Sequence, residues 1–597
     1  MSVEEFNNIP HYLYDYVEKW AQQKPDEIAI IDADDGKFFT WKAFKNAVDM
    51  ICIKLMEDGW QKGDIIASML PLVPEHIFFE YACFRLGIIF CPLDVRLKER
   101  ELIRCMKLLK DTRRLGFIHL DDTETTNKRG EKKFYPFKQY ANKIREECPY
   151  VKDFIQFSPA EDIEPHSNTV GVLEYTEDMK ETFLNLQKNP DQYQEKLKVI
   201  EEKAKQVKED DPILIIYTTG TTGFPKPAML TNEGIVAQNL CLSKGFDMTE
   251  DSRMLVNLPP SHVGCQTEQL MTVLYIGGIA VILHAFKADK TLKAIEKYKV
   301  TMLGQIPSLF MMEWYLPLYK KVDLSSLRFA LYGGQAVSRR FLEKLKQMAP
   351  YFGSGLGLTE LSGFCSYTPV GKNVSVDDIL ESLGHDFPIT PLSIREDMNE
   401  NGSAGAEKPN GEIGEVCYSG PQVFKGYYNN EEATRKTIST DGFCYTGDLG
   451  FKDEKGLHLV GRGKFVIKPK GYQVYPPEIE KHLEKMPEIY KAAVVGHRHE
   501  IYSEGVVAFI QLKYSARGKI TEKDIGEHAS SLAGYKRPSL YVFVDEIPLN
   551  RVDKTDYKTL NEEVKEVIAK ERVNGGWDAK ALEKIQLDKE EELNAQS

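Results

Sequence analysis

The chain has 597 residues, of which 42% are hydrophobic and 28% charged, an ordinary globular composition that is long enough for several packed cores. Its formal net charge of -13 argues against non-specific binding of nucleic acid, so any site for an anion must be locally basic. None of its ten cysteines forms a C-x-x-C pair, which excludes the usual zinc and redox motifs and favours reduced thiols in the cytoplasm.

The sequence predicts no segment that crosses a membrane. The first residues are acidic and lack an apolar core, so they do not resemble a signal peptide. The longest apolar stretch, residues 270–286, is interrupted by Gly277 and Gly278 and is shorter than the ~20 residues that a spanning helix needs. We expect it to be a helix that turns into a strand inside a core. Peripheral membrane contact and the oligomeric state stay open.

Strand and helix patterns alternate from residue 28 to about residue 118, which predicts parallel sheets covered by helices. Residues 65–70 and 87–90 are expected to be buried strands, with a helix over 75–85 between them. From about 121 to 211 the chain is rich in Lys, Glu and Asp and short of strand signals, so we interpret it as an inserted segment.

That inserted segment contains one clear amphipathic pattern. Five apolar residues recur at spacings of four and three, namely Tyr193, Leu197, Ile200, Ala204 and Val207. Such a stripe predicts one helix with a single buried face. A helix packed on the main domain is the simpler interpretation, and an interaction helix for a partner is the alternative.

After Pro212 the alternation resumes with a short β-branched run, Ile213 to Ile216, which predicts a buried strand. The loop that follows offers hydroxyl groups, glycine backbone and one lysine, all of which suit phosphate oxygens. Its residues are Thr218, Thr219, Gly220, Thr221, Thr222, Gly223 and Lys226. The spacing is not that of a Walker A loop. A loop for polyphosphate is favoured over a polar surface turn.

Two glycine-rich segments follow further along the chain. Tyr332-Gly333-Gly334-Gln335 comes directly after an apolar strand, and its glycines permit the close approach of a flat ring. Gly355-Leu356-Gly357 leads into Thr359-Glu360, and a glutamate near phosphates would be a hard oxygen ligand for Mg²⁺. Taken alone, the first is equally a strand-to-helix turn and the second a helix start with an acidic first turn.

Together these segments resemble the motifs of the adenylate-forming enzymes, which include acyl-CoA synthetases, peptide-synthetase adenylation domains and luciferases. Matched segments run from Phe39 to about Leu560, apart from the insert. The resemblance implies an α/β fold, with a large N-terminal domain of stacked α/β sheets over 1–461 and a hinge at 462–464. A smaller, mobile α+β C-terminal domain over 465–569 and a charged tail over 570–597 complete the expected organisation.

The resemblance also implies roles for single residues. Gly333, Gly334, Gln335 and Gly355–Gly357 would border adenine, Thr359 would contact the α-phosphate, and Glu360 would hold Mg²⁺. Asp448 and Arg462 would bind ribose, Lys464 would be the hinge, and His262 would line the route between acyl group and thiol. Lys470, Gly471 and Tyr472 would serve the thioester step, and Lys554 would bridge the carboxylate and the α-phosphate.

The activity that the resemblance implies is ATP-dependent activation of a carboxylic acid, followed by transfer to coenzyme A. Glycines near the expected acyl pocket favour a fatty acid of medium or longer chain, or a cyclic or aromatic acid. One alternative is a ligase that passes the acyl group to a carrier protein or another acceptor. Another is a catalytically silent binder of nucleotide or acyl groups, because Pro227, Leu356 and Asp553 depart from the family's pattern.

Overall fold

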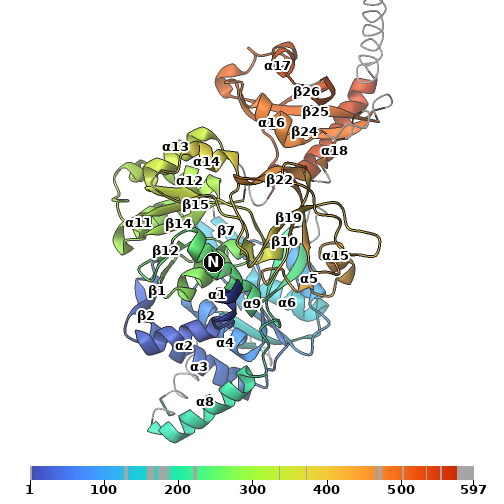
Figure 1. Ribbon diagram of the computed structural model, residues 1–597. Helices are drawn as coiled ribbons and strands as arrows, with labels where there is room; N and C mark the ends of the chain where they lie inside the picture. The colour runs from blue at the N-terminus through green and yellow to red at the C-terminus, as the bar shows by residue number, and fades with distance from the viewer. Residues whose placement is uncertain are drawn as a thin grey trace, which may run out of the picture.

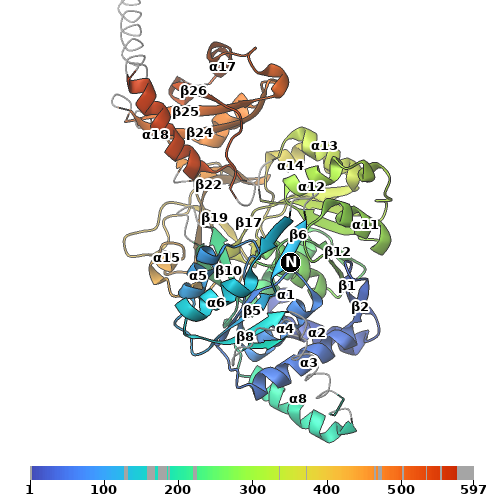
Figure 2. The same ribbon diagram turned by 180° about the vertical axis from the view of Figure 1, so that it is seen from behind.

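The computed structural model describes residues 3–126, 132–157, 169–171, 184–185, 188–219, 225–334, 337–371, 373–462, 465–467, 469, 474–499, 503–532, 534–550 and 554–573. Within these residues the strands form two large sheets, two smaller sheets and two hairpins. Most of the chain forms one large body, and the elements after β23 form a smaller lobe at one end of it (Figures 1 and 2). This arrangement confirms the predicted α/β fold with a large N-terminal and a smaller C-terminal domain.

The first large sheet is parallel except at one edge, where β1 and β2 pair antiparallel. Its strands, in spatial order, are β16 (Tyr351–Gly353), β15 (Phe329–Tyr332), β14 (Met302–Gln305), β12 (Arg253–Val256), β13 (Ile279–Ile282), β1 (Ile28–Asp32) and β2 (Lys37–Thr40). Its strands are short and largely buried, as expected for a parallel sheet with helices on both faces.

The second large sheet has a parallel centre and an antiparallel end formed by β10, β11 and β21. Its strands, in spatial order, are β21 (Gly426–Tyr427), β11 (Pro225–Thr231), β10 (Pro212–Thr219), β4 (Ile89–Pro92), β3 (Ile65–Met69), β5 (Leu115–Leu120), β8 (Val151–Phe157) and β9 (Thr169–Gly171). The predicted strands at 65–70, 87–90 and 213–216 are therefore confirmed, with small shifts at their ends.

Helices lie between the two large sheets and on their outer faces. The inner layer consists of α2 (Leu13–Gln23), α3 (Trp41–Glu57), α4 (Pro74–Leu86), α9 (Asn232–Gly245), the π-helix η2 (Gly264–Met271) and α10 (Thr272–Tyr275). The outer helices are α11 (Ala288–Tyr298), α12 (Pro307–Trp314), α13 (Arg339–Met348) and α14 (Val376–Glu381) on the first sheet, and α5 (Glu99–Leu108) and α6 (Phe137–Glu147) on the second. The stretch 270–286 forms the predicted helix followed by a strand.

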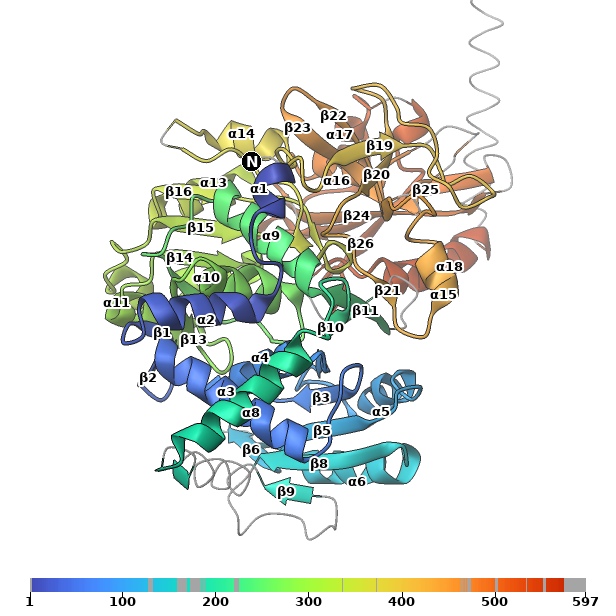
Figure 3. The same cartoon turned by 60° about the horizontal axis from the view of Figure 1, so that its bottom comes forward.

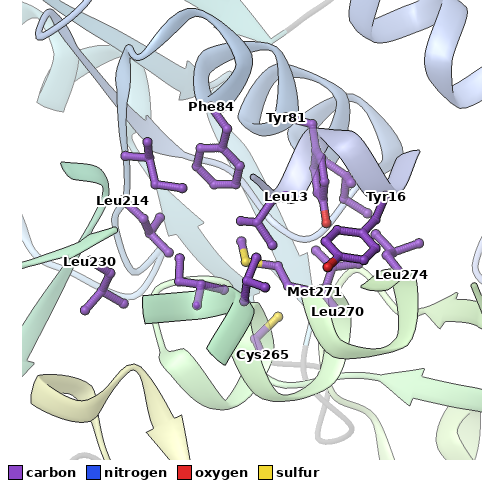
Figure 4. Packing of buried hydrophobic residues seen from close by; sticks show 14 of the residues in the cluster. Leu13, Tyr16, Tyr81, Phe84, Leu214, Leu230, Cys265, Leu270, Met271 and Leu274 are labelled. Carbon is purple, nitrogen blue, oxygen red and sulfur yellow. The ribbon is translucent and has the colours of Figure 1, made fainter. Parts of the chain in front are cut away.

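The alternation of side chains along each strand fixes this layering. Ile30 packs into the core between the sheets, whereas its neighbour Ile31 packs beneath the outer helices. Ile66 and Ile65 divide in the same way on the second sheet, because successive strand residues point to opposite faces. Figure 4 shows the inner core, where Leu13, Phe84, Leu214 and Met271 converge from four different elements.

A smaller antiparallel sheet follows, with the order β19 (Leu392–Arg395), β20 (Gly414–Tyr418), β22 (Cys444–Asp453) and β23 (Gly456–Arg462). The short hairpin of β17 (Gly357–Leu358) and β18 (Gly363–Phe364) encloses η4 (Thr359–Leu361). Two short helices, α1 (Val3–Asn7) and α15 (Glu431–Arg435), lie outside these layers. Among the described residues, no helix is long and apolar enough to cross a bilayer, and the ten cysteines are all buried and unpaired.

The C-terminal lobe has two hydrophobic cores of its own, one on each face of its sheet. The sheet consists of β24 (Ile489–His499), β25 (Ser503–Leu512) and β26 (Leu540–Val544). Its helices are α16 (Pro476–Leu483), α17 (Glu522–Ala529) and α18 (Tyr557–Val573). The exact domain limits at 461 and 465, and the hinge between them, stay predictions.

Residues 121–211 are short of strand signals in the sequence, yet their first part forms strands. A hairpin of β6 (Thr123–Thr126) and β7 (Lys132–Tyr135) is followed by α6, and β8 then pairs parallel with β5 in the second sheet. The charged residues concealed this strand, because Asp153 in β8 accepts from Arg114 at 2.6 Å while Val151 and Phe154 are buried. Whether the remainder is an insertion stays a prediction.

The amphipathic helix in that stretch is confirmed as α8 (Pro190–Ala204). Figure 3 shows α8 lying across α3 and α4, and Ile200 is fully buried there. Its Tyr193 donates a hydrogen bond to Asp49 at 3.3 Å, and Asp49 also accepts from Arg85 of α4 at 2.5 Å. A buried carboxylate thus joins three helices, and the apolar face of α8 is covered within the chain.

One buried carboxyl group gives a test of the fold by pH. Glu313 on α12 is fully buried, and one oxygen accepts from Gln305 at 2.9 Å. Its other oxygen has no hydrogen-bond partner among the described residues. Burial raises the pKa of Glu313 to about 8, so the folded protein keeps a proton that the unfolded chain loses near its ordinary pKa of 4.5.

We therefore expect the stability of the wild-type protein relative to Glu313→Gln to fall as pH rises from about 4.5 to 8. In that window the unfolded state binds fewer protons than the folded state, which costs up to about 1.4 kcal/mol per pH unit. Scanning calorimetry of both proteins at pH 5 and pH 8 measures the effect as a growing Tm advantage of the variant. A Tm difference that does not change with pH would contradict a buried, protonated Glu313.

Candidate active site

One large cavity, of about 1510 Å³, lies where the two large sheets, the smaller antiparallel sheet and the C-terminal lobe meet. Ten of the residues predicted from the sequence line it, namely Thr218, Lys226, His262, Gly333, Gly334, Gly355, Gly357, Thr359, Glu360 and Lys554. They come from segments more than 300 residues apart in the sequence. The cavity is therefore the candidate active site.

The other predicted residues divide into two groups. Leu356, Asp448 and the backbones of Thr219 and Arg462 are described, and of these Leu356 and Asp448 are not among the lining residues of the cavity. The remainder lie outside the described residues, namely Gly220, Thr221, Thr222, Gly223, Gln335, Lys464, Lys470, Gly471 and Tyr472. Their roles stay predictions.

The predicted phosphate loop connects β10 and β11, which form an antiparallel pair. Thr218 lies opposite Lys226 and Thr219 opposite Pro225, so both strands end at the same edge of the cavity. The hydroxyl oxygen of Thr218 is buried and has no hydrogen-bond partner among the described residues. An unsatisfied hydroxyl beside a lysine in a cavity suits an anionic ligand, because burying such a group without a partner costs free energy.

Lys226 is held by an aromatic side chain that the sequence analysis did not single out. Its ammonium nitrogen lies 4.0 Å from the centre of the Tyr427 ring, within the range of a cation–π interaction. Burial lowers the pKa of Lys226, and the nearby Glu360 opposes that shift. The lysine is thus partly desolvated, which strengthens its attraction for a phosphate that enters the cavity.

Glu360 contacts the hydroxyl group of the same tyrosine, whereas Lys226 contacts its ring. The Tyr427 hydroxyl donates a hydrogen bond of 2.6 Å to one oxygen of Glu360, and the backbone N–H of Phe424 donates to the Glu360 carbonyl at 3.0 Å. Thr359 and Glu360 form the 3-10 turn η4 at the end of a hairpin, which places them beside β11, the strand that follows the predicted phosphate loop. Carboxylate and hydroxyl oxygens so placed suit Mg²⁺ bound to a phosphate.

His262 precedes the π-helix η2, and its carbonyl accepts from the N–H groups of Cys265 and Gln266. Burial lowers the pKa of His262, and Asp94 opposes that shift. Asp94 itself is engaged by Arg96, which donates to it at 2.6 Å. The imidazole is therefore neutral at physiological pH and faces the cavity as a polar but uncharged group.

Lys554 reaches the cavity from the C-terminal lobe. It lies in a turn that is closed by Asn550, whose N–H donates to the Lys554 carbonyl at 2.7 Å. A Cβ atom on Gly334 would lie 3.9 Å from Cε of Lys554. Gly334 has a φ of +87°, a conformation that glycine adopts at little cost. The end of β15 and the predicted catalytic lysine are thus neighbours.

Asp448 and Arg462 lie directly opposite each other on β22 and β23. Asp448 is 6% exposed, and its N–H donates to the hydroxyl of Thr446 at 3.1 Å. The adjacent Gly447 lines the cavity, and its N–H donates to Glu415 at 2.9 Å. The turn is therefore fixed at the cavity wall, with the two predicted ribose-binding residues in register.

Three cavity residues were missed by the sequence analysis: Tyr427, Glu415 and Glu268. Burial raises the pKa of Glu415 to about 6 and that of Glu268 to about 8. Tyr427 lies in a two-residue strand that is too short to give a periodic signal. A single glutamate has no sequence signature either, whether it lies on a helix, as Glu268 does, or in a strand, as Glu415 does, so only the three-dimensional arrangement identifies these residues.

Two family models for AMP-binding enzymes match this chain. A family model described as AMP-binding enzyme matches residues 17–428, and one described as AMP-binding enzyme C-terminal domain matches residues 478–554. Since the first match covers more than half of the chain, the protein belongs to this family, within the adenylate-forming superfamily. The predicted resemblance is confirmed.

Two relatives illustrate the range of the family. A 4-coumarate–CoA ligase of Humulus lupulus is 34% identical over 355 residues, which span 57% of this chain and 62% of that protein. A long-chain-fatty-acid–CoA ligase of Bacillus subtilis is 29% identical over 577 residues, which span 93% of this chain and 96% of that protein. Among solved structures, ATP-bound MatB from Rhodopseudomonas palustris has a similar fold, with a TM-score of 0.73 at 22% identity over 94% of this chain and all of that one.

The contact between Tyr427 and Glu360 gives the second prediction. Tyr427→Phe keeps the ring beneath Lys226 but removes the hydrogen bond to Glu360. Because a hydrogen bond to a charged group is worth roughly 1.5–3 kcal/mol, we expect about a tenfold weaker affinity for Mg·ATP in titration calorimetry. Tyr427→Leu, which also removes the ring, should lose more. Unchanged affinity and unchanged Mg²⁺ dependence in Tyr427→Phe would mean that the hydroxyl only fills space.

Proposed function

We propose that this protein activates a carboxylic acid with ATP and then transfers the acyl group to coenzyme A. In the first step a carboxylate oxygen attacks the α-phosphorus of ATP, and the bond to the bridging oxygen breaks, so that pyrophosphate leaves and acyl-AMP forms. In the second step the thiolate of coenzyme A attacks the acyl carbon, and AMP leaves with the carboxyl oxygen. The products are acyl-CoA, AMP and pyrophosphate.

The observation that carries this proposal is the position of Lys554 beside Gly334, in the same cavity as Lys226 and Glu360. Two anions have to meet in the first step, so positive charge is needed between them. Lys554 supplies that charge from one side, and Lys226 with the loop after Thr218 holds the outer phosphates. A preorganised cation of this kind is worth ~3–4 kcal/mol of barrier.

The remaining residues complete the proposed site. Thr359 donates to the α-phosphate, Asp448 and Arg462 bind ribose, and Gly333, Gly334, Gln335 and Gly355–Gly357 border adenine. Glu360 would hold Mg²⁺, whose charge would neutralise the phosphates of bound ATP. Neutral His262 lines the route between acyl group and thiol.

The second step is proposed to use a different orientation of the C-terminal domain. Rotation of residues 465–569 about the hinge at 462–464, with Lys464 at its centre, would bring Lys470, Gly471 and Tyr472 to the cavity for coenzyme A. The family's C-terminal model matches within that range and supports a separate unit. We place the reaction in the cytoplasm, because ten buried unpaired cysteines suit a reducing compartment.

The acid is proposed to be a fatty acid of medium or longer chain, or a cyclic or aromatic acid. Relatives are named for long-chain fatty acids, 4-coumarate and indoleacetate, which supports this range without choosing within it. A ligase that uses a carrier protein differs in one product, since free coenzyme A would then accept no acyl group. Product analysis with coenzyme A as the only acceptor separates the two, and formation of ADP in place of AMP would overturn both.

Lys554 gives the third prediction. We expect Lys554→Ala to lose at least about a hundredfold in acid-dependent pyrophosphate release, in line with removal of one oriented charge. Thioester formation from supplied acyl-AMP should continue, because that step needs no charge between two anions. Lys558→Ala, which changes an exposed lysine on α18, is the matched control. Equal loss of both steps in Lys554→Ala would refute the role assigned to this residue.

A further inference from the structure

Glu268 is a carboxyl group in the cavity that the proposed reaction does not use. It lies on the π-helix η2, and its side chain points toward the hairpin of β17 and β18. If Gly357 carried a Cβ atom, that atom would lie 3.1 Å from one carboxyl oxygen of Glu268. A Cβ atom on Gly363 would lie 3.0 Å from Cγ of Glu268. A Cβ atom at either position would crowd the glutamate, and the φ of +131° at Gly363 also favours glycine there.

This carboxyl group has no hydrogen bond or ion pair with any residue in the described part of the chain. Glu313 accepts from Gln305, and Glu480 accepts from Tyr557 at 2.7 Å. Glu80 is fully buried with both oxygens unbonded among the described residues, but it does not line the cavity, so Glu268 differs from it in lying where a ligand can reach it. Burial is the cause of the raised pKa of Glu268, about 8, and no neighbouring charge contributes. A carboxyl group placed in a cavity without a protein partner is available to a ligand. Its position on a π-helix agrees with this, since π-helical turns occur frequently at functional sites.

The position of Glu268 relative to the reacting end follows from a chain of neighbours. Lys554 lies beside Gly334, and a Cβ atom on Gly333 would be 3.3 Å from Cζ of Phe364. Phe364 is next in sequence to Gly363, which contacts Glu268. Lys554, Phe364 and Glu268 line the same cavity, so an acid whose carboxylate is at Lys554 and whose body lies along the ring of Phe364 would reach Glu268.

We propose that Glu268 determines specificity by forming a hydrogen bond with a hydroxyl or N–H group on the body of the acid, so that the substrate is a hydroxy- or amino-substituted aromatic acid. This inference rests on the proposed function and narrows it. An unsubstituted alkyl chain would leave the carboxyl group buried without a partner, at a cost of roughly 1–3 kcal/mol. The phenyl ring of Phe364 beside Gly333 offers a flat apolar surface for the ring of such an acid.

The test compares matched acids on the wild-type enzyme by kcat/KM for pyrophosphate release. The pairs are 4-hydroxycinnamate with cinnamate, and indole-3-acetate with naphthalene-1-acetate, and decanoate represents alkyl acids. We expect the acid with the hydroxyl or N–H group to be preferred by at least about tenfold within a pair, because a site built for a hydrogen bond rejects the analogue that lacks it.

Variants then assign the preference to Glu268. Glu268→Leu should abolish it by slowing the substituted acid, whereas Glu268→Gln should retain most of it, because an amide both donates and accepts. Glu268→Met serves as a second apolar variant, and Mg·ATP affinity close to wild type shows that each variant is folded. Glu313→Gln is the matched control, since it changes a buried carboxyl group of similar pKa that does not line the cavity, and it should leave the preference unchanged.

The outcomes separate this inference from the proposed function. If wild-type enzyme releases pyrophosphate with several acids but shows no preference within the pairs, the role of Glu268 is refuted and acid activation stands. The same holds if the preference survives in Glu268→Leu and Glu268→Met. If none of the acids supports pyrophosphate release, the proposed function fails and this inference fails with it.

Discussion

The site depends on one side chain that holds a cation and an anion apart. Tyr427 places its ring against Lys226 and its hydroxyl against Glu360, so the two charges share one support without forming an ion pair. A direct pair would neutralise both groups, and neither would then be available to phosphate or metal. Because Tyr427 belongs to the edge strand β21, which pairs with β11, the phosphate strand is positioned by the same contact. Lys226 thereby stays available to an anionic ligand although the protein as a whole is acidic.

The layered fold explains why distant segments meet there. Both large sheets end at the cavity, and the inner helices hold them at a fixed separation through a continuous apolar core. The π-helix η2 lies between the sheets, and its Thr267 donates to the carbonyl of Ser362 at 2.6 Å. Ser362 in turn donates to the carbonyl of Gln422 at 3.1 Å, which links the helix, the Thr359-Glu360 turn and the segment before β21. These hydrogen bonds thus join opposite walls of the cavity, which are the proposed acyl side and the proposed phosphate side.

The sequence was sufficient to predict the parallel sheets, the phosphate strand and the location of Lys226, Glu360 and Lys554, because each depends on local composition or on an ordered motif. It failed at β8, where an ion pair between Asp153 and Arg114 allows charged residues within a sheet. It also failed at Tyr427 and Glu268. Their roles arise from contacts across long sequence separations, which leave no local pattern.

Two departures from the family's pattern are absorbed by the backbone. Pro227 lacks an N–H group, yet it lies within β11 opposite Tyr217, and its carbonyl accepts from the N–H of Tyr428 at 2.8 Å. Leu356 is 9% exposed, and its N–H donates to the Ser366 hydroxyl at 3.0 Å while its carbonyl accepts from Cys365. Both residues therefore preserve the hydrogen bonds that hold the phosphate strand and the glycine-rich segment at the cavity. Since catalysis of phosphoryl transfer depends mainly on where charges are held, these two departures do not by themselves displace the charged groups that the proposed site uses.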